Sequence, residues 1–340
     1  MNDELVLVTG GTGFVGSHCI VRLLDAGYQV RTTLRSLARA DDVRALVRAG
    51  GADPAGLEYA QADLLHDDGW HAAAAGAIYV LHVASPFPVR QPKDASELIA
   101  PARDGSLRVL RAARDARVRR VVLTSSFAAV GYSSRPDRPF TEEDWTDPDD
   151  PGLSPYVRSK AIAERAAWDF VDYEGGDLEL SVVNPVGIFG PALGADLSSS
   201  VALLRALLTG RVPAVPHGQT SGVDVRDVAD LHVRAMMHPD ASGERFLAVS
   251  GEPITYPDLA RLLRERLGDD ARRVPRIVIP DWVVRIGANL DADLRAMLPE
   301  LNRSRRASSE KAQSVLGWRP RPRDEAIIAS AESLLRLGLV

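Results

Sequence analysis

Short apolar runs alternate, along the first half of the chain, with segments whose apolar residues recur at helical spacing. The runs read "LVLV" from Leu5, "YQVRTTL" from Tyr28, "LEYAQA" from Leu57, "AIYVLHVA" from Ala77, "RVVLTSS" from Arg120 and "LELSVVNP" from Leu178. Between them, "FVGSHCIVRLLDAG" and "SLRVLRAARDAR" are striped like helices, and Gly27 stands where a helix commonly ends. Apolar strands separated by helices are typical of buried parallel strands, so the pattern predicts an α/β fold with a doubly wound parallel sheet.

The alternation of apolar runs and helical segments ends after Pro185, where Gly, Pro and Ser become frequent and the helical segments are isolated. One of them, "TYPDLARLLRERLG", carries leucines on one face behind a Thr255/Asp258 capping pattern, and another begins at about Asp324. We therefore expect two domains. Residues 1–184 and about 218–250 form the sheet domain, and about 185–217 and 251–340 form a smaller, irregular α/β domain.

One loop, "SSRPDRPFTEEDWTDPDDP" from Ser133 to Pro151, is rich in Pro and acidic residues. Charge runs of this kind usually form a solvated connection, which is the interpretation we favour. The alternative is a flap beside a functional site, because the loop joins the strand at Val121 to the helix at Tyr156. Trp145 in this loop, and His82 in a strand, are expected to serve packing.

Composition narrows the class of partner. The 340 residues are 45% hydrophobic and 26% charged, and the formal net charge is −5 with no long run of one sign. This excludes the basic footprint of a nucleic-acid binder and points to a small-molecule partner. The chain has one cysteine, Cys19, and no apolar stretch long enough for a membrane span, so we expect a soluble cytoplasmic protein without an internal disulfide.

A glycine-rich turn joins the first strand to the first helix. In "TGGTGFVG" the glycines Gly10, Gly13 and Gly16 are spaced three apart directly before the helix. Glycines let such a turn close and let backbone N–H groups approach a pyrophosphate, which the helix dipole also favours. In this context the motif predicts a nucleotide-binding, Rossmann-type domain rather than an accidental glycine turn.

The end of the second strand bears on which nucleotide is bound. It reads "TTLRSLAR" and lacks the carboxylate that takes the ribose hydroxyls in NAD-binding versions. A guanidinium such as that of Arg35, with Arg39 a turn later, suits a 2′-phosphate, so NADP(H) is expected; two surface arginines are the alternative. After the third strand, Asp63 could accept a hydrogen bond from adenine and Leu64 could pack on the ring, although Asp is also a common turn residue.

Candidate chemistry lies in "SPYVRSK". Tyr156 and Lys160 are four residues apart and share a face of a helix, where an ammonium group would favour the phenolate and lower the pKa of the tyrosine. A hydroxyl such as that of Ser126 in "VVLTSS" could hold a substrate oxygen against Tyr156. With a nicotinamide nearby this is carbonyl reduction chemistry. The alternative is a partly buried tyrosine beside a surface lysine.

With these motifs in order, the sequence resembles the extended short-chain dehydrogenase/reductases. The resemblance runs through "TGGTGFVG", "TSS", "YVRSK", "NPVGIFGP", "VDVRDVADLH" and "LGWRPRP" and covers nearly the whole chain. Through "GYQVRTTLR", "HVASPF" and "SKAIAERAAWDF" it is most similar to the branch of dihydroflavonol reductases, cinnamoyl-CoA reductases and microbial aldehyde/ketone reductases.

The resemblance implies that Tyr156 donates a proton to the carbonyl, that Lys160 holds the nicotinamide ribose, and that Ser126, in preference to Ser125, completes the group. The cofactor contacts that it implies are Thr9, Gly10, Gly13, Phe14, Val15, Gly16, Arg35, Asp63, Leu64, Val83, Ala84, Ser85, Thr124, Tyr156, Lys160, Pro185, Val186, Ile188 and Ser200. Substrate contacts are expected at the carboxyl edge of the sheet, at Phe87, Phe127, Tyr132 and His217, and no metal ion is expected.

Two departures from the branch concern the substrate. Gly131 stands where plant dihydroflavonol reductases have an asparagine, and "LSPYV" replaces the "NWYCY" of cinnamoyl-CoA reductases. We therefore expect NADPH-dependent reduction of an aldehyde or ketone without assuming either plant substrate, in a monomer or homodimer. The alternatives are a nucleotide-sugar epimerase or dehydratase with bound NAD, and a non-catalytic NADPH-binding regulatory module.

Overall fold

The computed structural model describes residues 4–85, 96–133, 137–287 and 305–340 and divides the chain into two units. The sheet unit comprises residues 1–186, 226–248 and 308–319, and the smaller unit comprises 187–225, 249–307 and 320–340.

A parallel sheet of seven strands forms the centre of the sheet unit, in the order β11-β6-β5-β4-β1-β2-β3. Its strands are β1 (Leu5–Val8), β2 (Gln29–Leu34), β3 (Glu58–Gln61), β4 (Tyr79–His82), β5 (Arg120–Thr124), β6 (Glu179–Pro185) and β11 (Glu244–Ala248). The first six strands lie in the six apolar runs, which confirms the predicted doubly wound sheet. The order reverses between β1 and β4, the place where such sheets bind ligands.

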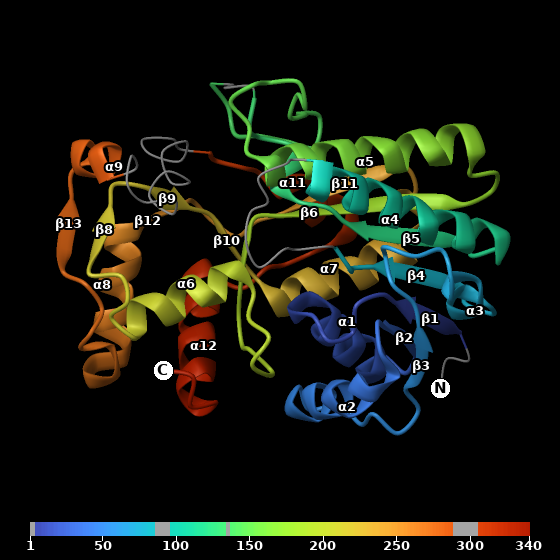
Figure 1. The fold of residues 1–340 in the computed structure, drawn as a ribbon, viewed down its shortest axis with the longest axis horizontal. Coiled ribbons are helices and arrows are strands. Elements are labelled where there is room, and N and C mark those ends of the chain that lie inside the picture. The colour runs from blue at the N-terminus through green and yellow to red at the C-terminus, as the bar shows by residue number, and fades with distance from the viewer. Residues whose placement is uncertain (1–3, 86–95, 134–136, 288–304) are drawn as a thin grey trace. The chain divides into compact units, whose positions relative to one another are not determined.

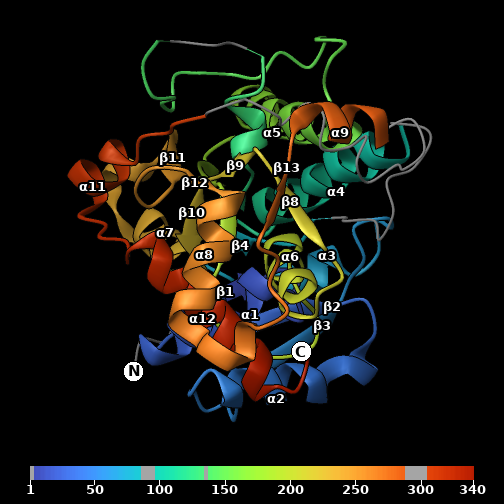
Figure 2. The ribbon, with the colours of Figure 1, turned by 90° about the vertical axis from the view of Figure 1, so that its left-hand side faces the viewer.

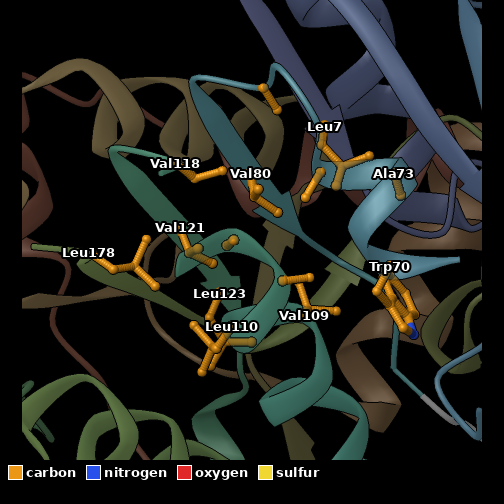
Figure 3. Close-up of a cluster of buried hydrophobic side chains, with 14 of the residues drawn as sticks. Leu7, Trp70, Ala73, Val80, Val109, Leu110, Val118, Val121, Leu123 and Leu178 are labelled. Carbon is orange, nitrogen blue, oxygen red and sulfur yellow. The ribbon is translucent and has the colours of Figure 1, made fainter. Parts of the chain in front are cut away.

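Helices cover both faces of this sheet. They are α1 (Phe14–Asp25), α2 (Ala40–Ala49), α3 (Trp70–Ala74), α4 (Ser96–Asp115), α5 (Pro155–Glu174), α7 (Val225–Met237) and α11 (Glu310–Leu316), with short 3-10 turns η1 (Leu37–Arg39), η2 (Phe127–Ala129) and η3 (Pro239–Ala241). Figure 1 shows α4 and α5 on one face and α1 and α7 on the other. On the α4/α5 face, the strand side chains of Leu7, Val80 and Val121 meet Val109 and Leu110 of α4 in a buried cluster (Figure 3).

Helix α1 illustrates how the local sequence sets an element. Its middle is buried on all sides, from Gly16 to Val21, and Leu23 is buried as well, so the lone cysteine, Cys19, packs in the core. The helix ends where Gly27 adopts φ +83°, a conformation that glycine takes at little cost, and its N–H donates to Leu24 O at 2.9 Å. The C-terminal glycine expected from the sequence is therefore confirmed.

The smaller unit contains three two-stranded sheets: β7 with β10, β9 with β12, and β8 with β13. Its elements are β7 (Gly187–Phe189), α6 (Ser199–Leu208), β8 (Ala214–Pro216), β9 (Gln219–Thr220), β10 (Gly222–Asp224), β12 (Ile254–Thr255), α8 (Tyr256–Leu267), η4 (Gly268–Ala271), β13 (Ile277–Ile279), α9 (Asp281–Gly287) and α12 (Arg323–Arg336). Helices α8 and α12 lie side by side (Figure 2). Thr255 caps α8 by accepting from the Asp258 N–H, as its sequence predicts.

The border between the two units differs from the predicted one by more than two residues in two places. Residues 308–319, expected in the smaller domain, belong to the sheet unit, because Trp318 is fully buried and its Nε1 donates to Asp227 O at 2.9 Å. Residues 218–225, expected in the sheet domain, belong to the smaller unit, where β10 pairs with β7 and β9 with β12. Both differences arise from pairings between segments that are distant in the sequence.

Candidate active site

The glycine turn between β1 and α1 closes tightly on itself. Gly10 has φ +75°, and the Gly13 N–H donates to Gly10 O at 2.9 Å. A Cβ added at Gly16 would lie 2.3 Å from Gly10 O, and one added at Gly10 would lie 3.1 Å from Ala84. Side chains at these positions would therefore fill the turn, so the structure explains why the chain carries glycine there.

The first turn of α1 opens onto this cradle. The helix begins at Phe14 with Gly13 as its N-cap, and no side chain caps it. The first amide groups of a helix have no partner within the helix, and those of Phe14, Val15 and Gly16 stand next to the glycine turn. An uncapped helix start with its positive dipole end fits a pyrophosphate.

Thr9 fixes the neighbouring loop. Its Oγ1 is fully buried and accepts from the N–H groups of Val83 at 3.0 Å and Ala84 at 2.9 Å. The same hydroxyl lies 2.9 Å from His82 Nδ1, to which it donates. Burial, with the nearby charge of Lys160, lowers the pKa of His82 to about 3, so this imidazole is neutral. His82, assigned to packing from the sequence, thus also holds the hydroxyl that anchors the loop after β4.

Helix α5 carries the candidate tyrosine in its first turn. Ser154 caps the helix by accepting from the Val157 N–H, and Pro155 occupies the start, where a missing N–H costs nothing. Tyr156 is half-buried and hydrogen-bonded to the Ser126 side chain. Burial raises the pKa of Tyr156, and the hydrogen bond with Ser126 lowers it less.

The raised pKa corrects one expectation. The sequence predicts that Lys160 lowers the pKa of Tyr156, but desolvation outweighs any such effect in this structure. The Lys160 Nζ instead donates to Ser85 Oγ at 2.9 Å, in the loop after β4. Burial lowers the pKa of Lys160 itself to about 8, opposed by the negative charge of Glu164.

The two adjacent serines after β5 have different partners. Ser126 bonds Tyr156 and also accepts from the Ala128 N–H at 3.1 Å, at the start of η2. The Ser125 side chain is buried and donates to Glu164 Oε2 at 2.5 Å. The structure therefore brings Ser126, and not Ser125, together with Tyr156.

A histidine that the sequence interpretation did not single out lies beside Thr124. His232 Nε2 is 2.6 Å from Thr124 Oγ1, and His232 Nδ1 is 2.7 Å from Val228 O. The ring is fully buried, which lowers its pKa to about 4. A neutral His232 therefore donates from Nδ1 to Val228 and accepts from Thr124, a pairing that spacing along the chain could not indicate.

The expected adenine-side contacts have distinct surroundings. Arg35 is exposed just after β2 and makes no ion pair within the described part of the chain, whereas Arg39 pairs with Asp42 at 2.9 Å. Asp63 Oδ1 accepts from the Leu65 N–H at 3.0 Å, the turn role that the sequence offered as the alternative. Leu64 packs against the buried cluster of the sheet.

The remaining cofactor candidates are divided between the units. Pro185 ends β6, and the Val186 N–H donates to Ala248 O at 3.2 Å in the sheet unit. Ile188 lies in β7 and Ser200 in α6, both in the smaller unit.

The substrate candidates are also scattered. His217 is an exposed residue of the smaller unit, and Phe87 lies outside the described residues. The Phe127 ring is buried against Tyr132 and Phe140, with centroids 6.2 Å and 5.6 Å away. A Cβ added at Gly131 would lie 2.3 Å from the Phe127 ring. The departure at position 131 therefore has a packing reason, because a side chain there would displace this ring.

The acidic loop is anchored more firmly than a solvated connection would be. Arg245 Nη1 of β11 donates to the main-chain oxygens of Glu142 and Asp144, and the Leu247 N–H donates to Glu142 Oε1. The Trp145 ring lies under the Arg245 guanidinium, 3.7 Å from centroid to Cζ, which confirms its packing role. Together with α5, β11 and α11, this part of the loop lines a pocket of about 830 Å3 that contains none of the predicted cofactor or substrate residues.

The model of the NAD dependent epimerase/dehydratase family matches residues 6–248. The chain belongs to this family. It is 34% identical to a cinnamoyl-CoA reductase of Medicago truncatula, over 97% of this chain and 95% of the relative, and 35% identical to a dihydroflavonol 4-reductase of Hordeum vulgare, over 85% and 80%. These relatives place it in the reductase branch of the extended short-chain dehydrogenase/reductases.

A solved structure agrees over the whole chain. The yeast methylglyoxal/isovaleraldehyde reductase Gre2, solved with NADPH, has a TM-score of 0.80 and 26% identity and covers 99% of this chain and 100% of its own. Two further observations concern membrane spans and metal sites. Among the described residues, no helix is both long and apolar enough to span a bilayer, and no three His, Cys, Asp or Glu side chains are grouped to bind a metal ion.

Proposed function

We propose that this protein is an NADPH-dependent reductase that converts an aldehyde or ketone to the alcohol. The observation that carries the proposal is the hydrogen-bonded pair of Tyr156 and Ser126, with Lys160 one helical turn beyond Tyr156 on α5 and an uncapped glycine cradle after β1, two strands from β5 in the same sheet. The relatives are named reductases, and the solved neighbour Gre2 contains NADPH.

NADPH fits the residues present. The backbone of Gly10 to Gly16 would hold the pyrophosphate, since added side chains would fill the turn. Arg35, exposed and without an ion pair in the described residues, would bind the 2′-phosphate. When bound, NADPH supplies the hydride for the carbonyl carbon.

The protein's own groups supply and stabilise the proton. Because burial raises the pKa of Tyr156, the phenol stays protonated at neutral pH, as a proton donor to the carbonyl oxygen must be. Ser126 donates to the same oxygen as charge develops on it, and its bond to Tyr156 sets the direction of the phenol. Lys160, whose pKa is about 8, is mainly an ammonium at neutral pH and stabilises the phenolate left after proton transfer.

The test is NADPH oxidation across aliphatic, aryl, keto-ester and flavonoid carbonyls, with Tyr156→Phe as the variant. Turnover should fall by about 100-fold or more, because general acid catalysis contributes on that scale, while NADPH affinity is retained. Tyr173→Phe is the matched control, since Tyr173 lies on the same helix and is 86% exposed. Near-full activity of Tyr156→Phe would reject the mechanism.

The same assays separate the alternatives. An epimerase or dehydratase would turn over nucleotide sugars with co-purified NAD, but the end of β2 offers Leu34 and Arg35 in place of an acid. A regulatory module would bind NADPH and oxidise none of it against the carbonyl panel.

A further inference from the structure

A carboxylate lies buried in the protein one helical turn beyond Lys160. Glu164 of α5 is 1% exposed. An ionised carboxylate removed from water is strongly destabilising unless it is paired and hydrogen-bonded. The hydrogen bonds and ion pair that stabilise the Glu164 carboxylate therefore indicate its role.

Three side chains, from the ends or bodies of three neighbouring strands, donate to this carboxylate. Ser125 Oγ, just after β5, is 2.5 Å from Oε2, and Asn184 Nδ2, in β6, is 2.7 Å from the same oxygen. Arg245 Nε, in β11, is 2.6 Å from Oε1. The Glu164 side chain thus joins helix α5 to β5, β6 and β11, and Ser126 follows the first of these strands.

Arg245 serves as a fixed counter-ion. Its side chain is 7% exposed, and its Nη1 donates to Glu142 O and Asp144 O while the guanidinium lies over Trp145. These contacts hold the arginine whether or not Glu164 is charged. The acidic loop therefore secures the partner that makes a buried carboxylate tolerable.

The Glu164 carboxylate influences the candidate site in two ways, through a hydrogen-bonded asparagine and through its charge. Asn184 Nδ2, besides bonding Glu164, donates to Ser126 O at 3.2 Å and so fixes the main chain of that serine. The second route is electrostatic. The charge of Glu164 raises the pKa of Lys160 against the effect of burial, and the other groups near Lys160 are the Ser85 hydroxyl, Tyr156 and the neutral His82.

We propose that Glu164 is a positioning residue of this site: its buried carboxylate keeps Lys160 an ammonium ion and, through Asn184, holds Ser126 in place, with Arg245 as counter-ion. The proposal rests on the proposed function for its consequence in turnover. The state of Lys160 can be measured independently of any activity.

The chain suits a direct measurement because it contains only three lysines, Lys93, Lys160 and Lys311. Protein labelled with 13C at lysine Cε would be titrated by NMR, with and without NADP+, and Lys93→Arg and Lys311→Arg would assign the signals. In Glu164→Gln the Lys160 midpoint should fall by about one pH unit or more, the scale expected for unit charges roughly one helical turn apart. The alkaline limb of kcat for carbonyl reduction should move in the same direction.

Ser125→Ala is the matched control, because it removes a hydrogen bond from the same carboxylate and keeps the charge. Its Lys160 midpoint should stay within a few tenths of a pH unit of the parent, an experimental tolerance set well below the charge effect. Should Glu164→Gln fail to fold, the double variant Glu164→Gln/Arg245→Gln removes both charges of the ion pair. Its Lys160 midpoint should fall in the same direction by a smaller amount, because loss of the arginine's positive charge partly offsets loss of the carboxylate. An unchanged midpoint in whichever of these folds, or an equal fall in Ser125→Ala, would overturn the proposal. Absence of carbonyl reduction in the parent protein would instead count against the proposed function.

Discussion

The Lys160 ammonium donates a hydrogen bond of 2.9 Å to the Ser85 hydroxyl, which ties helix α5 to the loop after strand β4. That loop is itself fixed to the end of strand β1, since the Val83 and Ala84 N–H groups donate to the buried Thr9 hydroxyl. Lys160 is therefore positioned, through the loop after β4, by Thr9, the residue that joins β1 to the glycine turn.

Removal of the Ser85 hydroxyl should loosen Lys160. We expect Ser85→Ala to lower kcat/KM for carbonyl reduction by about tenfold, because a hydrogen bond to a charged group contributes roughly 1.5–3 kcal/mol. Steady-state kinetics would measure this, and Ser85→Thr, which keeps the hydroxyl, should recover most of the loss. Equal kinetics in Ser85→Ala and the parent would show that this bond does not matter for turnover.

Arg35 should decide the preference between the two nicotinamide cofactors. Arg35→Ala should weaken NADPH binding by about 10- to 100-fold through loss of charge-assisted bonds to the 2′-phosphate, and leave NADH binding nearly unchanged. Fluorescence titration with each cofactor measures both. Arg39→Ala is the control, because Arg39 is already paired with Asp42. A parent protein that prefers NADH would contradict the assignment.

Gly16 should tolerate no side chain, although it lies within a helix. Helix propensity alone predicts that Gly16→Ala stabilises the protein by about 1 kcal/mol. The new Cβ would lie 2.3 Å from Gly10 O, so we expect a net loss of about 1–3 kcal/mol in the free energy of unfolding instead.

Urea unfolding and NADPH titration would show the effect of Gly16→Ala on stability and on binding. Gly56→Ala is a suitable control, since its added Cβ would meet nothing within 4 Å. A Gly16→Ala protein as stable as the parent, with unchanged NADPH affinity, would refute the account of the turn.

His232 should make the protein less stable in mild acid. Its pKa is about 4 in the folded protein and near the ordinary 6.5 when unfolded, so the unfolded chain binds more protons between these values. The stability contributed by the neutral ring is therefore complete above pH 6.5 and is lost as the pH falls toward 4. Urea unfolding at several pH values, compared with His232→Gln, isolates this effect. The stability difference between parent and variant should shrink as the pH is lowered, and a constant difference would contradict the prediction.

Much of the sheet could be read from local pattern, and the exceptions have a common cause. The six apolar runs became β1 to β6 because continuous burial leaves a signature in each strand by itself. The seventh strand, β11, was not recognised as one, because "ERFLA" is short and mixes charged with apolar residues. Its Arg245 is buried only because Glu164 of α5 and the acidic loop supply partners.

The candidate site shows the same division. Spacing alone places Tyr156 and Lys160 on one helix face, but the chemistry of Ser125 and Ser126 is identical in the sequence. Their different partners, Glu164 and Tyr156, come from distant segments. Whether the pKa of Tyr156 is raised or lowered likewise depends on burial, which the local spacing of residues does not reveal.

By itself, then, the sequence determined the first six strands of the sheet, the glycine turn before α1 and the four-residue spacing of Tyr156 and Lys160. These features depend on neighbours within one or two turns of chain, where periodicity and glycine conformation act. Only the tertiary structure decided that Ser125 bonds Glu164 while Ser126 bonds Tyr156, that Trp318 joins the sheet unit, and that Glu164 lies buried against Arg245. Those outcomes depend on desolvation and on contacts between residues far apart in the chain, which exist only after the sheet has assembled.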